Sequence, residues 1–159
     1  MRCGEQHRIL VFGAGVIGTF YATLFAAAGE KVSLLARGRR LEQLRSRRDI
    51  TVLDRVDEGD RFDFIFVAVR SNQVLSALGT LRDNVSETIV TLANSDGDYT
   101  AWEEAAGKGR LLPAFPGAGG AIDAAGIPSR SFPPSSGGSL PRDSLPFLCG
   151  LTPSAAGKK

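Results

Sequence analysis

Blocks of apolar and polar positions alternate along the chain and predict strands and helices in turn. A short apolar run predicts a strand at residues 9–12, and apolar residues at helical spacing predict a helix over residues 16–28. Further strands are predicted at 31–36, 49–53, 64–69, 88–92 and 111–115, with helices at 72–78 and 99–106. Strands that alternate with helices favour the α/β class, with a doubly wound parallel sheet.

Two of these runs also indicate their place in the sheet. Residues 64–69 are almost all apolar, as expected for a strand that is buried on both faces of a parallel sheet. Pro113 lies within the last predicted strand and has no N–H to donate, which predicts a strand at the edge.

The composition changes at about Pro128. Six of the eight prolines lie from there to the end, among many Ser and Gly residues and without any periodic pattern. Such a segment buries too little apolar surface to offset its ordering entropy. We therefore expect one folded domain over residues 1–127 and a disordered Pro/Ser/Gly-rich tail over residues 128–159.

The most informative motif follows the first strand, where Gly13, Gly15 and Gly18 form the pattern G-x-G-x-x-G at the start of a helix. Strand, glycine turn and helix in this order are the fingerprint of a Rossmann-type dinucleotide-binding unit. Gly13 would allow the tight turn, Gly15 the approach of a pyrophosphate, and Gly18 close packing of the helix. The alternative is a glycine turn that binds no nucleotide. The expected binding segment is Gly13, Ala14, Gly15, Val16, Ile17 and Gly18.

The end of the second strand bears on the choice of cofactor. NAD-binding domains usually carry an acidic residue there for the ribose 2′-OH, whereas this chain has Arg37-Gly38-Arg39-Arg40 and no carboxylate between residues 31 and 40. A guanidinium suits the 2′-phosphate of NADP, so we assign Arg37 to that phosphate. For Arg39 and Arg40 a phosphate contact and a solvated basic loop both remain open.

Composition excludes several other classes of function. The net charge of +2 gives no general argument for nucleic acid. Cys3 and Cys149 lie at opposite ends and His7 is the single histidine, so we expect no metal site. No run of 18 apolar residues and no secretory signal pattern occurs, so we expect no membrane span and a cytoplasmic location.

Several motifs in order resemble one family. The stretches RILVFGAGVIGTFYA, VSLLARG, FIFVAVRSNQV and IVTLANSDGD, with the glycine-rich turn at 115–120, are similar to the N-terminal domain of ketopantoate reductases (2-dehydropantoate 2-reductases). The resemblance covers about residues 8–122. It implies NADPH-dependent reduction of a 2-keto acid to a 2-hydroxy acid in pantothenate synthesis.

The resemblance also implies roles for single residues. Arg70 stands where the family often has Lys beside the cofactor cleft, and Gln73 matches a family Gln. Asn94 matches the Asn near the nicotinamide and substrate and is the one candidate catalytic residue, although a turn residue is the alternative. Ser95-Asp96 replaces the usual Gly-x after that Asn.

Family members also have a C-terminal helical domain that supplies a general-acid lysine and grips the substrate carboxylate. No such pattern follows residue 120, and Lys158 and Lys159 lie in the expected tail. We therefore expect the NADP-binding part of an oxidoreductase that is inactive alone, with a 2-keto acid as substrate and a separate helical-domain chain as a candidate partner. The alternative is a non-catalytic nucleotide-binding or interaction module from a truncated reading frame.

Overall fold

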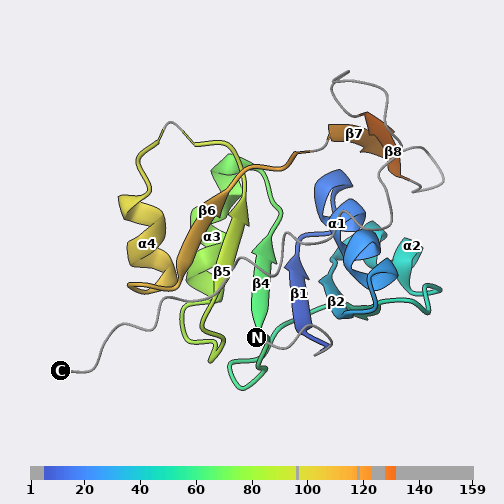
Figure 1. Cartoon of the computed structure of the whole chain (residues 1–159), viewed down its shortest axis with the longest axis horizontal. Helices are drawn as coiled ribbons and strands as arrows, with labels where there is room; N and C mark the ends of the chain where they lie inside the picture. The colour runs from blue at the N-terminus through green and yellow to red at the C-terminus, as the bar shows by residue number, and fades with distance from the viewer. Residues whose placement is uncertain (1–5, 96, 118, 123–127, 132–159) are drawn as a thin grey trace.

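The structure is a computed structural model that describes residues 6–95, 97–117, 119–122 and 128–131. It is built around a six-stranded parallel sheet with the strand order β3-β2-β1-β4-β5-β6 (Figure 1). The strands are β1 (Arg8–Phe12), β2 (Lys31–Leu35), β3 (Thr51–Leu53), β4 (Phe64–Val67), β5 (Ile89–Leu92) and β6 (Leu111–Ala114). This is the strand order of a Rossmann-type, doubly wound α/β domain, and the predicted fold class is confirmed.

Helices cover both faces of the sheet. They are α1 (Val16–Ala27), α2 (Gly38–Leu44), η1 (Ser71–Gln73), α3 (Val74–Thr80) and α4 (Thr100–Ala106). One core cluster joins the sheet to α1 and α2, and a second joins it to α3 and α4. Side chains alternate between the faces along β1, where Ile9 and Val11 enter the first cluster and Leu10 and Phe12 enter the second. Burial on both faces explains why these strands are continuous apolar runs.

β6 lies at the edge of the main sheet, as predicted from the presence of Pro113 in this strand. Among the described strands β6 pairs only with β5, with Pro113 opposite Thr91 in the parallel register. A strand at this position needs hydrogen bonds on one side only, so the missing N–H of proline is tolerated.

No helix was predicted at α2, whereas the chain turns into a helix at Gly38. Leu41 and Leu44 lie three residues apart and pack on the first core cluster. A seven-residue helix offers only these two apolar positions, which is too little for a visible helical period, and arginine is itself a good helix former.

A two-stranded antiparallel ribbon follows the main sheet. It pairs β7 (Gly119–Ile122) with β8 (Pro128–Ser131), beside α1 in Figure 1. β8 falls on the first four residues of the predicted disordered tail, and β7 begins within the predicted glycine-rich turn at 115–120. Glycine has no side chain to show a period of two, so no strand was predicted at β7. The remainder of the predicted tail, residues 132–159, lies outside the described residues.

Candidate dinucleotide-binding cleft

A cleft of about 520 Å³ opens at the carboxyl ends of the central strands. The chain leaves β1 toward one side of the sheet and β4 toward the other, so the strand order reverses between them, and open α/β sheets bind ligands at this point. Its walls come from the glycine turn after β1, the end of β2, the start of α2, and the segment from the end of β4 through η1 to α3. The lining residues are Phe12, Gly13, Ala14, Gly15, Leu35, Arg37, Arg40, Ala68, Val69, Arg70, Asn72, Gln73, Ser76, Ala77 and Thr80.

Each glycine of the turn has its own physical reason. Gly13 has φ +113°, and a Cβ there would lie 2.6 Å from the carbonyl oxygen of Ala68. At Gly18 a Cβ would lie 1.8 Å from the carbonyl oxygen of Gly13, so only glycine lets α1 approach the turn this closely. A Cβ on Gly15 would meet nothing within 4 Å. Gly15 is thus the glycine whose missing side chain leaves open space at the cleft, where a pyrophosphate needs it.

The N-terminus of α1 is arranged to accept an anion. Gly15 is the N-cap, no side chain caps the helix, and its first turn holds no acidic residue. The first N–H groups of a helix lack partners within the helix and carry a partial positive charge. The first intrahelical bond is donated by Thr19 to the Gly15 carbonyl at 2.9 Å. The N–H groups of Val16, Ile17 and Gly18 precede it and are the groups that would donate hydrogen bonds to phosphate oxygens.

Arg37 lies at the mouth of the cleft, directly after β2. It is exposed, is the N-cap of α2, and precedes Gly38, whose φ of +52° turns the chain into that helix. No carboxylate occurs among the described residues that line the cleft. This wall of the cleft therefore offers a cation where NAD-specific domains offer an acid.

Arg40 is half-buried between α2 and the glycine turn, where it donates hydrogen bonds to groups of the protein. Its Nε donates to the carbonyl oxygen of Ala14 at 3.0 Å, and its Nη2 donates to Oγ1 of Thr19 at 3.1 Å. Its Nη1 donates to Oε1 of Gln43 at 2.8 Å. Burial removes water from the guanidinium and lowers its pKa from the ordinary value. Arg40 is thus neither a solvated loop residue nor directed outward; it joins α2 to the glycine turn. Arg39 is exposed on the same helix.

Arg70 and Gln73 both line the opposite wall. Arg70 is the exposed N-cap of η1, and its carbonyl accepts a bond from the backbone N–H of Gln73 at 2.8 Å. The same wall carries three polar residues that were not predicted as site residues: Asn72, Ser76 and Thr80. Their spacing of four residues places them on one helical face. A polar stripe at i, i+4 and i+8 is the sequence signal that would have indicated them.

Asn94 lies apart from this group. It follows β5, one strand further along the sheet, and is exposed. It is not among the residues that line the cleft. The structure thus brings Arg37, Arg70 and Gln73 together with the glycine turn, while Asn94 stands past the carboxyl end of the neighbouring strand. Asp96, part of the departure from the family motif, lies outside the described residues.

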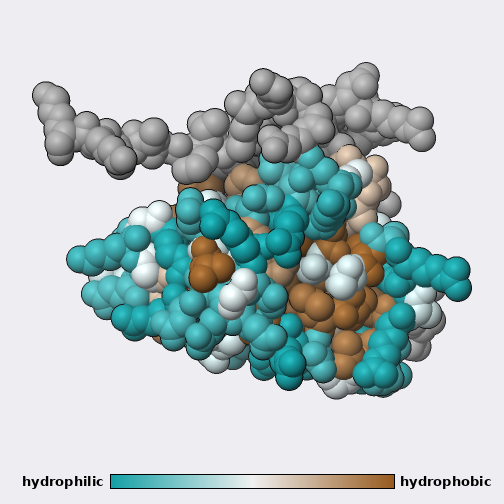
Figure 2. All heavy atoms as spheres, turned by 90° about the horizontal axis from the view of Figure 1, so that it is seen from below, coloured by the Kyte–Doolittle hydropathy of each residue, from teal (hydrophilic) through white to brown (hydrophobic). Residues whose placement is uncertain are grey.

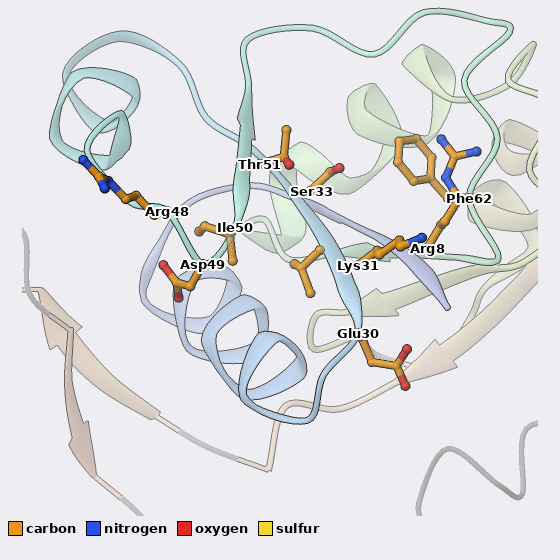
Figure 3. A pocket seen from close by; sticks show the side chains of 10 residues that line it. Arg8, Glu30, Lys31, Ser33, Arg48, Asp49, Ile50, Thr51 and Phe62 are labelled. Atoms are coloured by element: carbon orange, nitrogen blue, oxygen red, sulfur yellow. The ribbon is translucent and has the colours of Figure 1, made fainter. Parts of the chain in front are cut away.

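A second hollow of about 420 Å³ lies at the amino ends of β1, β2 and β3 (Figure 3). Two of its charged groups already have partners within the protein. Arg8 stacks over the ring of Phe62, with 5.7 Å from its Cζ to the ring centroid, and Glu30 accepts from Nδ1 of His7 at 3.3 Å. Figure 2 views this amino edge, where hydrophobic areas are set in a largely hydrophilic surface. The hollow lacks the helix N-terminus and the glycine turn found at the carboxyl edge.

Metal sites and membrane-spanning helices are both absent from the described part of the chain. No group of three or more His, Cys, Asp or Glu residues there could hold a metal ion. No described helix is long and apolar enough to cross a membrane.

Solved structures support the fold. A protein assigned as a ketopantoate reductase from Ralstonia solanacearum MolK2 is 18% identical with a TM-score of 0.68, over 92% of this chain and 58% of the other. The PanE/ApbA family ketopantoate reductase from Ralstonia eutropha JMP134 is 18% identical with a TM-score of 0.61, over 75% and 44%. Prephenate dehydrogenase from A. aeolicus, solved with NAD⁺, is 16% identical with a TM-score of 0.63, over 72% and 43%. The chain therefore spans less than two thirds of each of these proteins.

Sequence comparison identifies the family. No curated protein matches the chain. The family model described as ketopantoate reductase PanE/ApbA matches residues 9–127, which include the whole cleft and the main sheet except for Arg8, the first residue of β1. With this match over most of its length, the chain belongs to the ketopantoate reductase PanE/ApbA family, a family of oxidoreductases.

Proposed function

We propose that this chain is the NADP-binding part of a ketopantoate reductase-type oxidoreductase, which reduces a 2-keto acid to a 2-hydroxy acid with NADPH. The observation that carries the proposal is the cleft itself. It combines an uncapped helix N-terminus, open space at Gly15, and Arg37 on a wall without carboxylates. NADPH supplies the hydride for this reaction when it is bound.

The residues present fit that cofactor. Gly13 to Gly18 and the first N–H groups of α1 would hold the pyrophosphate. Arg37, exposed at the end of β2, would pair with the 2′-phosphate. Arg70 and Gln73 would lie along the opposite wall of the cleft. Asn94, past the end of β5, would approach the substrate side. These assignments place the adenosine end near β2 and the reacting end toward β4 and β5.

Reduction also requires a group that delivers a proton to the substrate carbonyl, and no lysine of the described part lies near the cleft to do so. The lysines of the described part are Lys31, at the amino end of β2, and Lys108, between α4 and the amino end of β6. Both lie at the edge opposite the cleft. We propose that a helical domain contributes the general acid and the grip on the substrate carboxylate, and that a separate chain is one way to provide it.

Calorimetry of the 159-residue chain with NADPH and NADH tests the cofactor assignment. NADPH should bind more tightly, and Arg37→Ala should weaken NADPH by about ten-fold or more, because a charge-assisted contact contributes roughly 1.5–3 kcal/mol. NADH should change little. Arg39→Ala is the matched control, since Arg39 is exposed on the same segment. Equal affinity of the native chain for both cofactors would contradict the assignment.

The alternative is a nucleotide-binding or interaction module without catalysis. Its supporting observation is that the described residues provide the cleft but no lysine near it. This alternative has the same cleft and the same cofactor as the proposed oxidoreductase. It differs only in that the protein would not turn over a substrate.

A further inference from the structure

Arg40 is the one cationic side chain in the described cleft whose three kinds of nitrogen all donate to groups of the protein. Two of the acceptors, the Ala14 carbonyl and the Thr19 hydroxyl, belong to the glycine turn and to the first turns of α1. The third, Gln43, lies on α2 together with Arg40. The guanidinium therefore connects the two elements that form this wall of the cleft.

The contact at Ala14 fixes a peptide plane. The carbonyl of Ala14 and the N–H of Gly15 belong to one planar trans peptide, so they point in opposite directions. The Ala14 oxygen accepts from Nε of Arg40 at 3.0 Å and from Oγ1 of Thr19 at 3.3 Å. With this oxygen held from two sides, the peptide that leads into the N-cap of α1 cannot rotate freely.

Thr19 is the second anchor of the same cluster. It is 1% exposed, and its hydroxyl donates to the Ala14 carbonyl while it accepts from Nη2 of Arg40. A buried hydroxyl that loses one of its partners carries a desolvation penalty. Arg40, Thr19 and Ala14 thus form one closed cluster that holds the turn in a single conformation.

Charge points in the same direction as geometry. The N-terminus of α1 has no acidic residue in its first turn and no capping side chain. A half-buried guanidinium beside it increases the local positive potential. This potential favours the state with a bound anion over the state without one. The anion that lies at this turn in a dinucleotide is the pyrophosphate, which NADH and NADPH share.

We infer that Arg40 is a positioning residue for the pyrophosphate: it locks the glycine turn through Ala14 and Thr19 and does not read the 2′-phosphate. This inference rests on the proposed dinucleotide binding. It assigns different tasks to two arginines three residues apart, with Arg37 determining which cofactor binds and Arg40 determining how tightly either one binds.

Calorimetry with NADPH and NADH on the full chain separates these tasks. Arg40→Gln should weaken both cofactors by a similar factor of about ten, which leaves the ratio of the two affinities unchanged. Arg40→Lys, which keeps the charge but not the fork, should recover part of the loss for both. Arg39→Gln on the same helix is the control and should change neither.

A double-mutant cycle tests the cluster itself. Thr19→Val removes the hydroxyl and keeps the shape of the side chain. If Arg40 acts through the turn, the losses in affinity from Thr19→Val and Arg40→Gln should be less than additive in the double variant. A purely structural effect would instead appear as a lower unfolding midpoint without cofactor, with no recovery by Arg40→Lys in the binding assay.

Three outcomes would overturn the inference. The first is a loss confined to NADPH in Arg40→Gln, which would make Arg40 a second 2′-phosphate contact. The second is unchanged affinity for both cofactors, and the third is strict additivity with Thr19→Val. Absence of binding by the native chain would overturn the proposed function together with this inference, whereas native binding with any of the three outcomes would overturn the inference alone.

Discussion

Gly18 is the residue at which steric space most clearly limits the sequence. Glycine inside a helix normally weakens it by about 1 kcal/mol relative to alanine. Here the carbonyl oxygen of Gly13 lies 1.8 Å from where a Cβ would be. The oxygen belongs to the backbone after β1, and the Cβ would be bonded directly to the backbone of α1. A rotamer change therefore cannot relieve the clash, and sterics outweigh helix propensity.

The residue-scale prediction is that Gly18→Ala lowers the free energy of unfolding by at least about 2 kcal/mol, in the range of overpacked cores. Gly15→Ala is the matched control, because the same methyl group would meet nothing within 4 Å and φ is −73°. Its cost should stay below about 1 kcal/mol. Urea unfolding of both variants measures the difference, and equal losses would show that the turn yields more easily than its geometry indicates.

At the scale of elements, Arg110 ties α3, α4 and the start of β5 to the chain that enters β6. Its Nε donates to the carbonyl of Ser86 at 3.1 Å, and its Nη1 donates to the carbonyls of Arg82 at 2.7 Å and Ala106 at 2.9 Å. Its Nη2 donates to the carbonyl of Asn84 at 2.7 Å. Burial lowers the pKa of Arg110, while the charge of Asp83 raises it. One side chain thus binds carbonyls of the loop between α3 and β5 and the carbonyl of the last residue of α4.

The element-scale prediction is that Arg110→Met destabilises the chain by roughly 2–4 kcal/mol, because charge-assisted bonds are lost and partly buried carbonyls lose their donor. Arg82→Met, at an exposed position in the same region, should stay within about 0.5 kcal/mol. Denaturant unfolding gives both values. Hydrogen exchange should show the loss concentrated in β5 and β6; an even loss over the whole sheet would argue against this local role.

At the scale of the molecule, the cleft is open on the side where β4 and β5 end. Arg70, Gln73 and Asn94 are all exposed there. A reduction needs a hydride donor and a proton donor at the carbonyl oxygen, with water kept away. The described residues provide a place for the first and no lysine near it for the second.

We therefore expect the 159-residue chain alone to bind NADPH but to turn over ketopantoate far more slowly than about 1 s⁻¹, the lower end of typical enzymes. General acid catalysis contributes about 10²–10⁴-fold, and substrate orientation contributes more. The absorbance of reduced nicotinamide, followed as NADPH is oxidised, measures the rate. A two-domain family member in the same assay is the control. Turnover at or above that rate would assign proton transfer to Asn94, Arg70 or a residue outside those described.

The sequence by itself determined the order of the six strands of the main sheet and of α1, α3 and α4, the class of the sheet and the place of the glycine turn. These features are local: buried parallel strands must be apolar on both faces, Pro113 cannot donate to a ladder, and Gly13 must turn with positive φ. The resemblance of short motifs to ketopantoate reductases was also readable, and it is confirmed by the family match over residues 9–127.

Only the tertiary structure decided what each polar side chain contacts. Arg37 and Arg40 have the same chemistry and lie three residues apart, yet one is exposed and the other donates to Ala14 and Thr19. Arg110 has no motif around it, and Asn94 stands apart from the cleft although its motif placed it near the cofactor. Hydrogen-bond partners more than twenty residues away depend on the crossing of elements, and short helices such as α2 leave too few apolar positions to predict that crossing.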